Sequence, residues 1–208
     1  MFKIHTFGDS HADGKHSHWG YINIPNVKII THHLFGKLMY TFGRLGLNCL
    51  NIKEFGVNEN DTAIFCFGEI DCRNHVHKHI TSENNYENVI DKLVVSYFNA
   101  MNENIKLFKK LNVCVYNVVP PSRGFKVDDS HPYPFLGSDE ERKSYTLYMN
   151  KKIQELCIKN NYFYFDIYDV SCDSDGFLNK NLSDGNVHLK NPIHSTNTIV
   201  RFLRNINL

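Results

Sequence analysis

Residues 2–10 read Phe-Lys-Ile-His-Thr-Phe-Gly-Asp-Ser, an apolar run that ends in the tripeptide Gly8-Asp9-Ser10. The run has the length and composition of a buried strand. Gly8 allows the backbone to turn sharply where the strand ends. Ser10 would then be held where its hydroxyl can face a ligand and its N–H can point at a developing oxyanion. This segment predicts a first strand that delivers a serine to the edge of a sheet.

A serine hydroxyl is a poor nucleophile unless a neighbouring base removes its proton. Residues 183–189, Ser-Asp-Gly-Asn-Val-His-Leu, offer such a base near the other end of the chain. We therefore expect His188 to accept the proton of Ser10 and to return it to the leaving alkoxide.

Between these two segments, short apolar runs alternate with longer stretches of helical periodicity. Strands are predicted over residues 4–7, 27–31, 62–67, 113–119 and 162–167, and helices over residues 34–45, 84–111, 139–159 and 195–206. Ser138 and Glu141 predict a capping box at the start of the third helix. The alternation predicts an α/β fold, a doubly wound parallel sheet with helices on both faces. Ligands of such sheets bind at the carboxyl ends of the strands, where residues 8–10, 68–71 and 120–121 are expected.

Composition favours one packed domain over residues 1–208, because 42% of the residues are hydrophobic and 13% aromatic. The 23 basic and 22 acidic residues leave a net charge of +1, which gives no reason to expect a nucleic-acid partner. No apolar stretch has the length of a membrane span, and no signal peptide is evident. The six cysteines lack Cys-x-x-Cys spacing and are expected to be reduced, in a cytoplasmic protein.

The order of these segments resembles that of the SGNH or GDSL-type serine hydrolases, a family of esterases, deacetylases, lipases and some acyltransferases. Gly8-Asp9-Ser10 matches the first block of that family, and Gly36 matches the glycine of its second block. Residues 68–71, Gly-Glu-Ile-Asp, match its Gly-x-Asn-Asp block in part. Residues 184–188 approximate its Asp-x-x-His block with one extra residue. The resemblance implies a three-layer flavodoxin-like fold and catalysis without a cofactor.

The resemblance also implies site residues. Asp184 would orient His188, although the family position three residues before the histidine is Gly185 here, and Asp173 and Asp175 are alternatives. The oxyanion hole would use the N–H groups of Ser10 and Gly36.

The third oxyanion donor of the family is an asparagine side chain, and this position is Ile70 here, which cannot donate. Arg73 or Asn74 could replace it. The residues expected to contact substrate are Asp9, His11, Glu69, Asp71 and Arg73. Alternatively, Glu69, Asp71 and Arg73 form a buried ion-pair network that shapes the pocket.

Two further segments attract interest. His75, His77 and His79 alternate, so in an extended segment they would share a face; a solvated loop is the favoured interpretation, and no metal site is expected. Residues 120–135 are rich in proline and aromatic residues, which favours a lid over the substrate.

The sequence thus predicts an ester hydrolase that works through an acyl-serine and removes a small acyl group, such as acetyl, from a carbohydrate or similar ester. An O- or N-acyltransferase acting on a glycan would share the same Ser/His machinery. A glycan-binding module of impaired activity is a third hypothesis, which Ile70 favours. The expected partner is a small-molecule or glycan ester, and the oligomeric state is left open.

Overall fold

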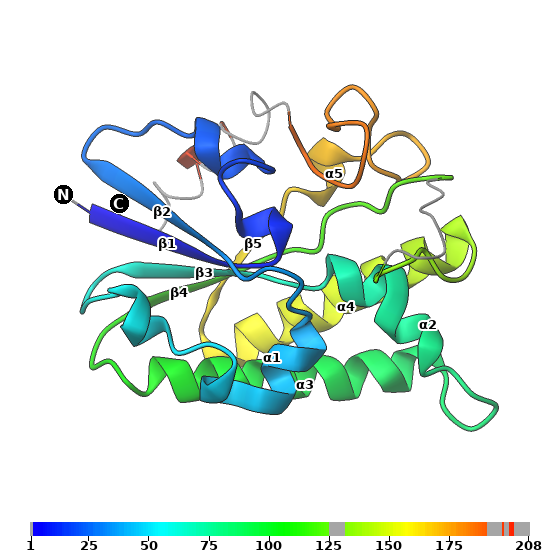
Figure 1. Ribbon diagram of the computed structural model, residues 1–208, viewed down its shortest axis with the longest axis horizontal. Helices are drawn as coiled ribbons and strands as arrows, with labels where there is room; N and C mark the ends of the chain where they lie inside the picture. Colours follow the sequence, from blue (N-terminus) through cyan, green and yellow to red (C-terminus); the bar gives the residue numbers. More distant parts are fainter. Residues whose placement is uncertain (1, 125–131, 191–196, 198–199, 202–208) are drawn as a thin grey trace.

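The structure, a computed structural model, describes residues 2–124, 132–190, 197, 200 and 201. Its centre is a sheet of five parallel strands in the order β2-β1-β3-β4-β5 (Figure 1). The strands are β1 (Phe2–Gly8), β2 (Val27–His33), β3 (Thr62–Cys66), β4 (Asn112–Tyr116) and β5 (Phe163–Phe165). This is the flavodoxin-like order, in which the order of the strands reverses between β1 and β3 and a crevice forms at their carboxyl ends.

Helices pack on the two faces of this sheet. Three of them, α1 (Met39–Leu45), α3 (Tyr86–Ile105) and α4 (Asp139–Asn160), lie together on one face (Figure 1). The opposite side carries α5 (Tyr168–Ser171) and the short helical turns that follow β1. The short helix α2 (Val76–Lys78) continues a π-helical turn over Asp71–His75. The predicted three-layer α/β fold is confirmed.

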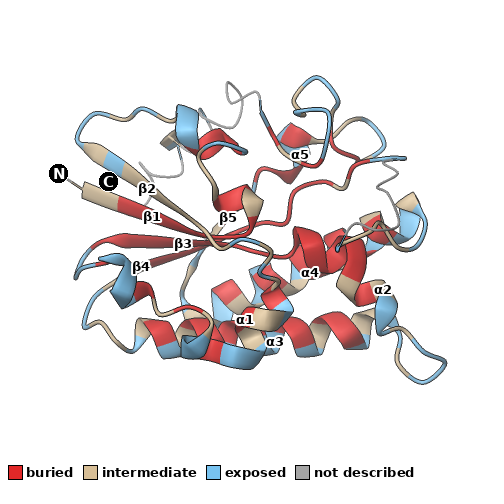
Figure 2. Cartoon of the chain, viewed as in Figure 1, coloured by how far each residue is buried: buried red, intermediate tan, exposed pale blue. Residues whose placement is uncertain are grey.

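Alternate residues of the central strands supply two separate cores, and the strands and the helices beside them are largely buried (Figure 2). Ala63 and Phe65 of β3 pack in the cluster that contains α1, α3 and α4. Ile64 and Cys66 face the other way, into a cluster with Trp19 and with segments near the C-terminus. β3 is buried at every position, as expected for a central parallel strand covered on both faces.

The capping box predicted for the third helix is confirmed. The Ser138 hydroxyl accepts a hydrogen bond from the Glu141 N–H, and the Glu141 carboxylate accepts one from the Ser138 N–H. The long helix predicted over residues 84–111 is shorter, since Asn85 caps its first turn and α3 ends at Ile105.

The helix predicted over residues 34–45 is wrong in its first half. Residues 34–38 form a loop, and α1 begins only at Met39. Gly36 has a φ of +62°, in the left-handed region that interrupts a helix. The predicted C-terminal helix, residues 195–206, lies almost entirely outside the described residues. Among the described helices, none has the length and apolar character needed to cross a membrane.

Gly8, the last residue of β1, has no room for a side chain beside β3. A Cβ at this position would lie 1.8 Å from the carbonyl oxygen of Cys66 in β3. The atom in the way belongs to the backbone of a fully buried strand, so it cannot move aside as a flexible side chain would. A residue without a Cβ is therefore required where β1 ends and the chain turns toward Ser10.

We expect Gly8→Ala to lower the free energy of unfolding by about 1–3 kcal/mol or more, because overpacking against backbone forces β1 and β3 apart. The measurement is urea denaturation followed by circular dichroism. Gly14→Ala is the matched control, since a Cβ there would meet its nearest neighbours at 3.4 Å, an ordinary contact distance. Equal stability losses in the two variants would contradict this account.

Candidate active site

Ser10 begins a short 3-10 turn, Ser10–Ala12, immediately beyond β1. Asp9 caps this turn, because its carboxylate accepts a hydrogen bond of 2.9 Å from the N–H of His11. The structure therefore places Ser10 just beyond the carboxyl end of β1, as the sequence predicts.

His188 and Asp184 lie beside this serine although they are about 175 residues away in sequence. The distance from Ser10 Oγ to His188 Nε2 is 2.8 Å, and the distance from His188 Nδ1 to Asp184 Oδ2 is also 2.8 Å. A carboxylate only accepts, so Nδ1 carries the proton and Nε2 is left to accept the Ser10 hydroxyl proton. The three side chains form a continuous Ser–His–Asp relay of hydrogen bonds.

The loop of residues 183–189 absorbs the extra residue that separates Asp184 from His188. Gly185 has a φ of +90°, and the Asp184 N–H donates to the His188 carbonyl at 3.0 Å. The second oxygen of Asp184 accepts the backbone N–H of Asn186 at 2.8 Å. The alternatives, Asp173 and Asp175, instead lie 3.6 and 2.6 Å from the guanidinium of Arg123. Of the three aspartates, Asp184 is the one that contacts His188.

Burial and charge set the ionisation of this pair. Burial, and next the positive charge of nearby His11, lower the pKa of His188 to about 4. Burial alone would raise the pKa of Asp184, but hydrogen bonds from His188 and Asn186 hold this pKa below its ordinary value. At neutral pH the imidazole is therefore neutral and the carboxylate ionised, the states that general-base chemistry requires.

A buried ion pair, formed by His11 and Asp9, lies beside the relay. His11 Nδ1 lies 3.0 Å from Asp9 Oδ1, and His11 Nε2 lies 3.1 Å from the carbonyl oxygen of Val187. Both partners are acceptors, so both ring nitrogens carry protons. Burial would lower the pKa of His11, but the Asp9 carboxylate, above all, raises it to about 9. The resulting imidazolium fixes the backbone next to His188.

The predicted contacts of Asp9 and His11 with substrate are therefore corrected. Both side chains are almost fully buried. Their polar atoms form hydrogen bonds with each other or with the backbone. They position the loop of His188 and do not line the cavity at Ser10.

The cavity at Ser10 has a volume of about 250 Å³. Residues from the ends of β1 and β2, from the segment after β3, from residues 132–133 and from the C-terminal loop line it: Ser10, His16, His33, Phe35, Gly36, Ile70, Arg73, Pro132, Tyr133, Asn186, Val187 and His188. Phe35 stands at its mouth with 88% of its surface exposed. Of the segment expected to form a lid, residues 125–131 lie outside the described residues, whereas Pro132 and Tyr133 reach the cavity.

Gly36 is brought to the cavity by backbone and side-chain contacts. The Leu34 N–H donates to the carbonyl of Gly8 at 2.7 Å, and the hydroxyl of Tyr133 donates to the carbonyl of Gly36 at 2.8 Å. Within the described part of the chain, no group accepts a hydrogen bond from the N–H of Ser10 or of Gly36. Two backbone donors without an acceptor among the described residues thus border the cavity, as an oxyanion hole requires.

Arg73 reaches the same cavity from the π-helical turn after β3. Its Nη2 lies 3.0 Å from Oε2 of Glu69, and its guanidinium packs over the ring of Phe135. Glu69 is buried beneath it, and burial raises the pKa of this carboxyl, offset in part by Arg73 and His11. Arg73 therefore borders the cavity as predicted, whereas Glu69 acts on it through Arg73.

Asp71 and Asn74 do not belong to the site, which corrects two further expectations. The Asp71 carboxylate accepts hydrogen bonds from the N–H groups of Met39 and Tyr40, at 2.7 and 3.1 Å, and is fully buried. It therefore caps the start of α1 and does not face substrate. Asn74 Nδ2 donates to the carbonyl of Pro134 at 3.1 Å, and Asn74 is not among the residues that line the cavity at Ser10.

The histidines after Asn74 lie on helical turns and not on an extended or looped segment. The rings of His75 and His79 are in contact, with centroids 4.3 Å apart, whereas His77 Nδ1 pairs with the Tyr145 hydroxyl at 3.1 Å. These three histidines therefore do not share one face, and they do not converge on a common ligand position.

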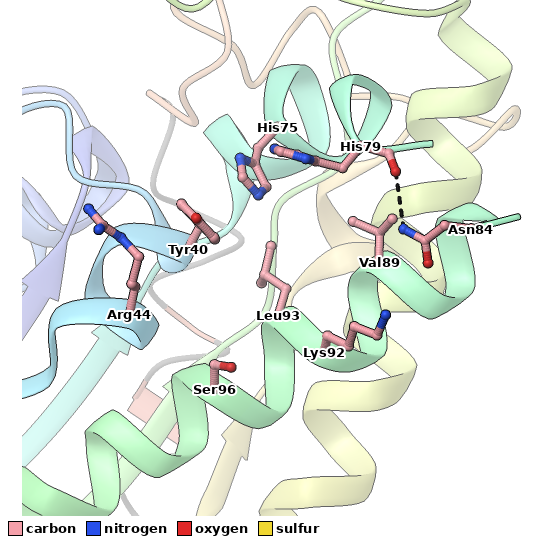
Figure 3. Close-up of a pocket in the computed structure, with 9 residues that line it drawn as sticks. All are labelled: Tyr40, Arg44, His75, His79, Asn84, Val89, Lys92, Leu93 and Ser96. Carbon is pink, nitrogen blue, oxygen red and sulfur yellow. Dashed lines mark hydrogen bonds between the residues drawn. The ribbon is translucent and has the colours of Figure 1, made fainter. Parts of the chain in front are cut away.

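A second, larger cavity of about 370 Å³ lies between α1, α2 and α3 (Figure 3). Tyr40 stacks on His75 in its lining, and Arg44 and Lys92 add positive charge. Ser96 is the one serine among its lining residues, and among the described residues no base hydrogen-bonds to the hydroxyl of Ser96. The smaller cavity at Ser10 is the one that combines a nucleophile, a base and free backbone donors.

Sequence reasoning missed His16, His33 and Phe35 as lining residues of the Ser10 cavity. Phe35 directly precedes Gly36 and His33 lies three residues before it, so the expected position of Gly36 next to the serine was the signal that could have found them.

No protein-family model matches the sequence, and no curated protein matches it. Solved structures do match. An aryl esterase from M. smegmatis superposes with a TM-score of 0.62 and 13% identity, covering 100% of this chain and 99% of that chain. A carbohydrate acetylesterase from Sinorhizobium meliloti gives 0.61 and 13% over 100% and 99% of the two chains. A GDSL-like lipase from Bacteroides thetaiotaomicron gives 0.61 and 10% over 98% and 86%. The chain shares the fold of these GDSL-type proteins, as its sequence resemblance implies.

Proposed function

We propose that this chain, built on the fold of the GDSL-type esterases and lipases, is a serine ester hydrolase in which Ser10 forms an acyl-enzyme. The observation that carries the proposal is the unbroken pair of 2.8 Å contacts from Ser10 through His188 to Asp184. Two unengaged backbone donors beside the serine complete the requirements for acyl transfer.

In the proposed reaction, His188 Nε2 takes the proton of Ser10 as its Oγ attacks the ester carbonyl. The negative charge on the carbonyl oxygen is stabilised by the N–H groups of Ser10 and Gly36. The ester C–O bond then breaks, and His188 gives its proton to the leaving alkoxide. Water repeats the sequence on the acyl-serine, releasing the carboxylic acid and regenerating the Ser10 hydroxyl.

A small acyl group suits this cavity. Its volume of about 250 Å³ lies below the usual range of about 300–1,000 Å³ for drug-sized ligands. Exposed Phe35 offers a ring face at its border, on which a sugar ring can pack. We therefore propose acetyl or a similarly short acyl group on a carbohydrate as the substrate class. A carbohydrate acetylesterase is among the proteins of the same fold.

We expect Ser10→Ala to lower kcat/KM for an activated acetyl ester such as p-nitrophenyl acetate by about 10⁴-fold or more, because the nucleophile is lost. A fluorophosphonate probe should label Ser10 in the parent protein. Ser96→Ala is the matched control, since among the described residues no base hydrogen-bonds to this exposed serine, and it should retain full activity. Labelling at another serine, or activity in Ser10→Ala, would overturn the mechanism.

The same assay with a sugar acceptor separates hydrolysis from transfer. An esterase releases acetate at a rate independent of acceptor, whereas a transferase gives acetylated sugar in proportion to acceptor. Sugar binding by calorimetry without any turnover would mark the binding module that the isoleucine at position 70 would favour.

Arg73 is proposed as the third donor to the oxyanion, in place of the side chain that Ile70 cannot supply. We expect Arg73→Ala to lower kcat and kcat/KM together, by about 100-fold or more. Arg73→Lys should recover part of this loss, because it restores the charge without the planar fork.

Loss of Arg73 also strands the buried Glu69 carboxyl, which by itself destabilises the protein. The double variant Glu69→Gln/Arg73→Ala removes this penalty, so its thermal stability should recover while kcat stays low. If kcat recovers with stability, Arg73 is structural and the oxyanion hole rests on backbone donors alone.

The pH dependence should follow His188. Only the neutral imidazole can accept the Ser10 proton, and burial together with His11 lowers its pKa to about 4. We therefore expect the acidic limb of kcat/KM to have its midpoint near pH 4, well below the value of about 6.5 typical of an exposed histidine. Circular dichroism at each pH separates this limb from acid unfolding. A midpoint near 6.5 in folded protein would contradict the assigned environment.

A further inference from the structure

Three side chains at the rim of the Ser10 cavity converge on one point. Asp13, His16 and His33, here termed the rim cluster, offer ligand atoms that all lie within 4.8 Å of one another. His16 Nδ1 lies 2.5 Å from Asp13 Oδ2, and His33 Nδ1 lies 3.6 Å from the same oxygen. They come from two distant segments, the turn after β1 and the last residue of β2.

We propose that the rim cluster binds one divalent transition-metal ion, of the zinc type. Two imidazoles and one carboxylate are ligands that zinc, cobalt and nickel prefer, whereas magnesium and calcium favour oxygen alone. Zinc–ligand bonds of about 2.0–2.1 Å in tetrahedral geometry place neighbouring ligand atoms about 3.3 Å apart. The Asp13–His33 distance is within about 0.3 Å of this value, and the Asp13–His16 pair needs to separate by less than about 1 Å. The two imidazole nitrogens lie within 4.8 Å of each other, so they need to approach by at most about 1.5 Å.

The backbone presents these ligands without large rearrangement. The Asp13 carbonyl accepts hydrogen bonds from both the N–H and the hydroxyl of Ser17, at 3.0 and 2.8 Å. Its Oδ1 accepts the Lys15 N–H at 3.2 Å, which leaves Oδ2 turned toward the histidines. His33 is fixed by the register of β2, in which it pairs with Gly8 of β1. The side chain of His16 is about half exposed (52%), so an ion can reach the cluster from solvent.

The cluster is separate from the catalytic relay but adjacent to it. The rings of His16 and His188 lie 5.8 Å apart, and both nitrogens of His188 are already engaged, by Ser10 and Asp184. His188 is therefore not a ligand in this arrangement. Because His16 and His33 also line the Ser10 cavity, the open coordination positions of the ion are accessible to an oxygen of a molecule in that cavity. This last point rests on the proposed function, whereas metal binding itself does not.

The test is isothermal titration calorimetry of chelator-treated, full-length protein with ZnCl₂. We expect one site of highest affinity per chain, and no comparable heat with MgCl₂ or CaCl₂. CoCl₂ should give visible d–d absorption bands at one equivalent, a readout that is independent of activity.

His16→Ala, His33→Ala and Asp13→Asn should each lower the zinc affinity by more than about 100-fold. Changes to residues that only support the ligands of a metal site already lower the affinity by roughly 10- to 100-fold. Circular dichroism without metal verifies that each variant is folded, and Asp13→Asn keeps the turn of the chain. The double variant His75→Ala/His79→Ala is the matched control, because it removes two neighbouring imidazoles elsewhere and should leave the site intact.

Ser10→Ala and His188→Ala should bind zinc with parent affinity, so the metal site can be confirmed even if the protein proves not to be an esterase. Loss of the site in His188→Ala would mean that the ion takes the catalytic histidine, and would overturn the separate rim site. Zinc affinity that is unchanged in the His16, His33 and Asp13 variants, or lost in the His75/His79 control, would also overturn it.

Discussion

The close approach of β1 to β3 at Gly8 is the constraint on which the site depends. A Cβ there would lie 1.8 Å from the Cys66 carbonyl, so the two central strands can pair to their ends only around glycine. The carbonyl of the same glycine accepts the Leu34 N–H, which draws the loop of Gly36 toward the serine. One residue without a side chain thereby brings together the ends of three neighbouring strands. The nucleophile and both backbone donors follow from this packing.

Beneath the cavity lies a layer of buried charge whose signs alternate from Asp9 through His11 and Glu69 to Arg73. The layer is costly to bury, so its members are held in place by one another. Its effect on the site is electrostatic and positional. The His11 imidazolium lowers the pKa of His188 and anchors the carbonyl of Val187 beside it. Asp9, His11 and Glu69, which the sequence analysis assigns to substrate contact, therefore hold the residues that face the cavity.

Local signals explain which features could be predicted. Some features can be recognised from a few consecutive residues, and these lie where expected. They are the apolar runs, the pair of Ser138 and Glu141, and the segments of Ser10 and His188. Asp71 could not be assigned, because its partners are backbone groups of α1 that only the tertiary fold brings near. The helix predicted from residue 34 was too long, since apolar periodicity does not report the left-handed backbone at Gly36. The rim cluster escaped notice because its histidines lie on segments 17 residues apart and meet only through β1–β2 pairing.

The same strand pairing governs both sets of functional side chains. Asp13 follows Ser10 by three residues, and His33 precedes Gly36 by three, so the register of β1 against β2 that aligns the two backbone donors also aligns the metal ligands. The hydrogen-bond partners of the ring nitrogens distinguish the roles of the four imidazoles. His188 is saturated by Ser10 and Asp184, and His11 by Asp9 and Val187, whereas His16 and His33 share one carboxylate oxygen. Four histidines around the cavity can thus hold a proton, a charge and an ion separately, because a different aspartate holds His188, His11 and the pair of His16 and His33.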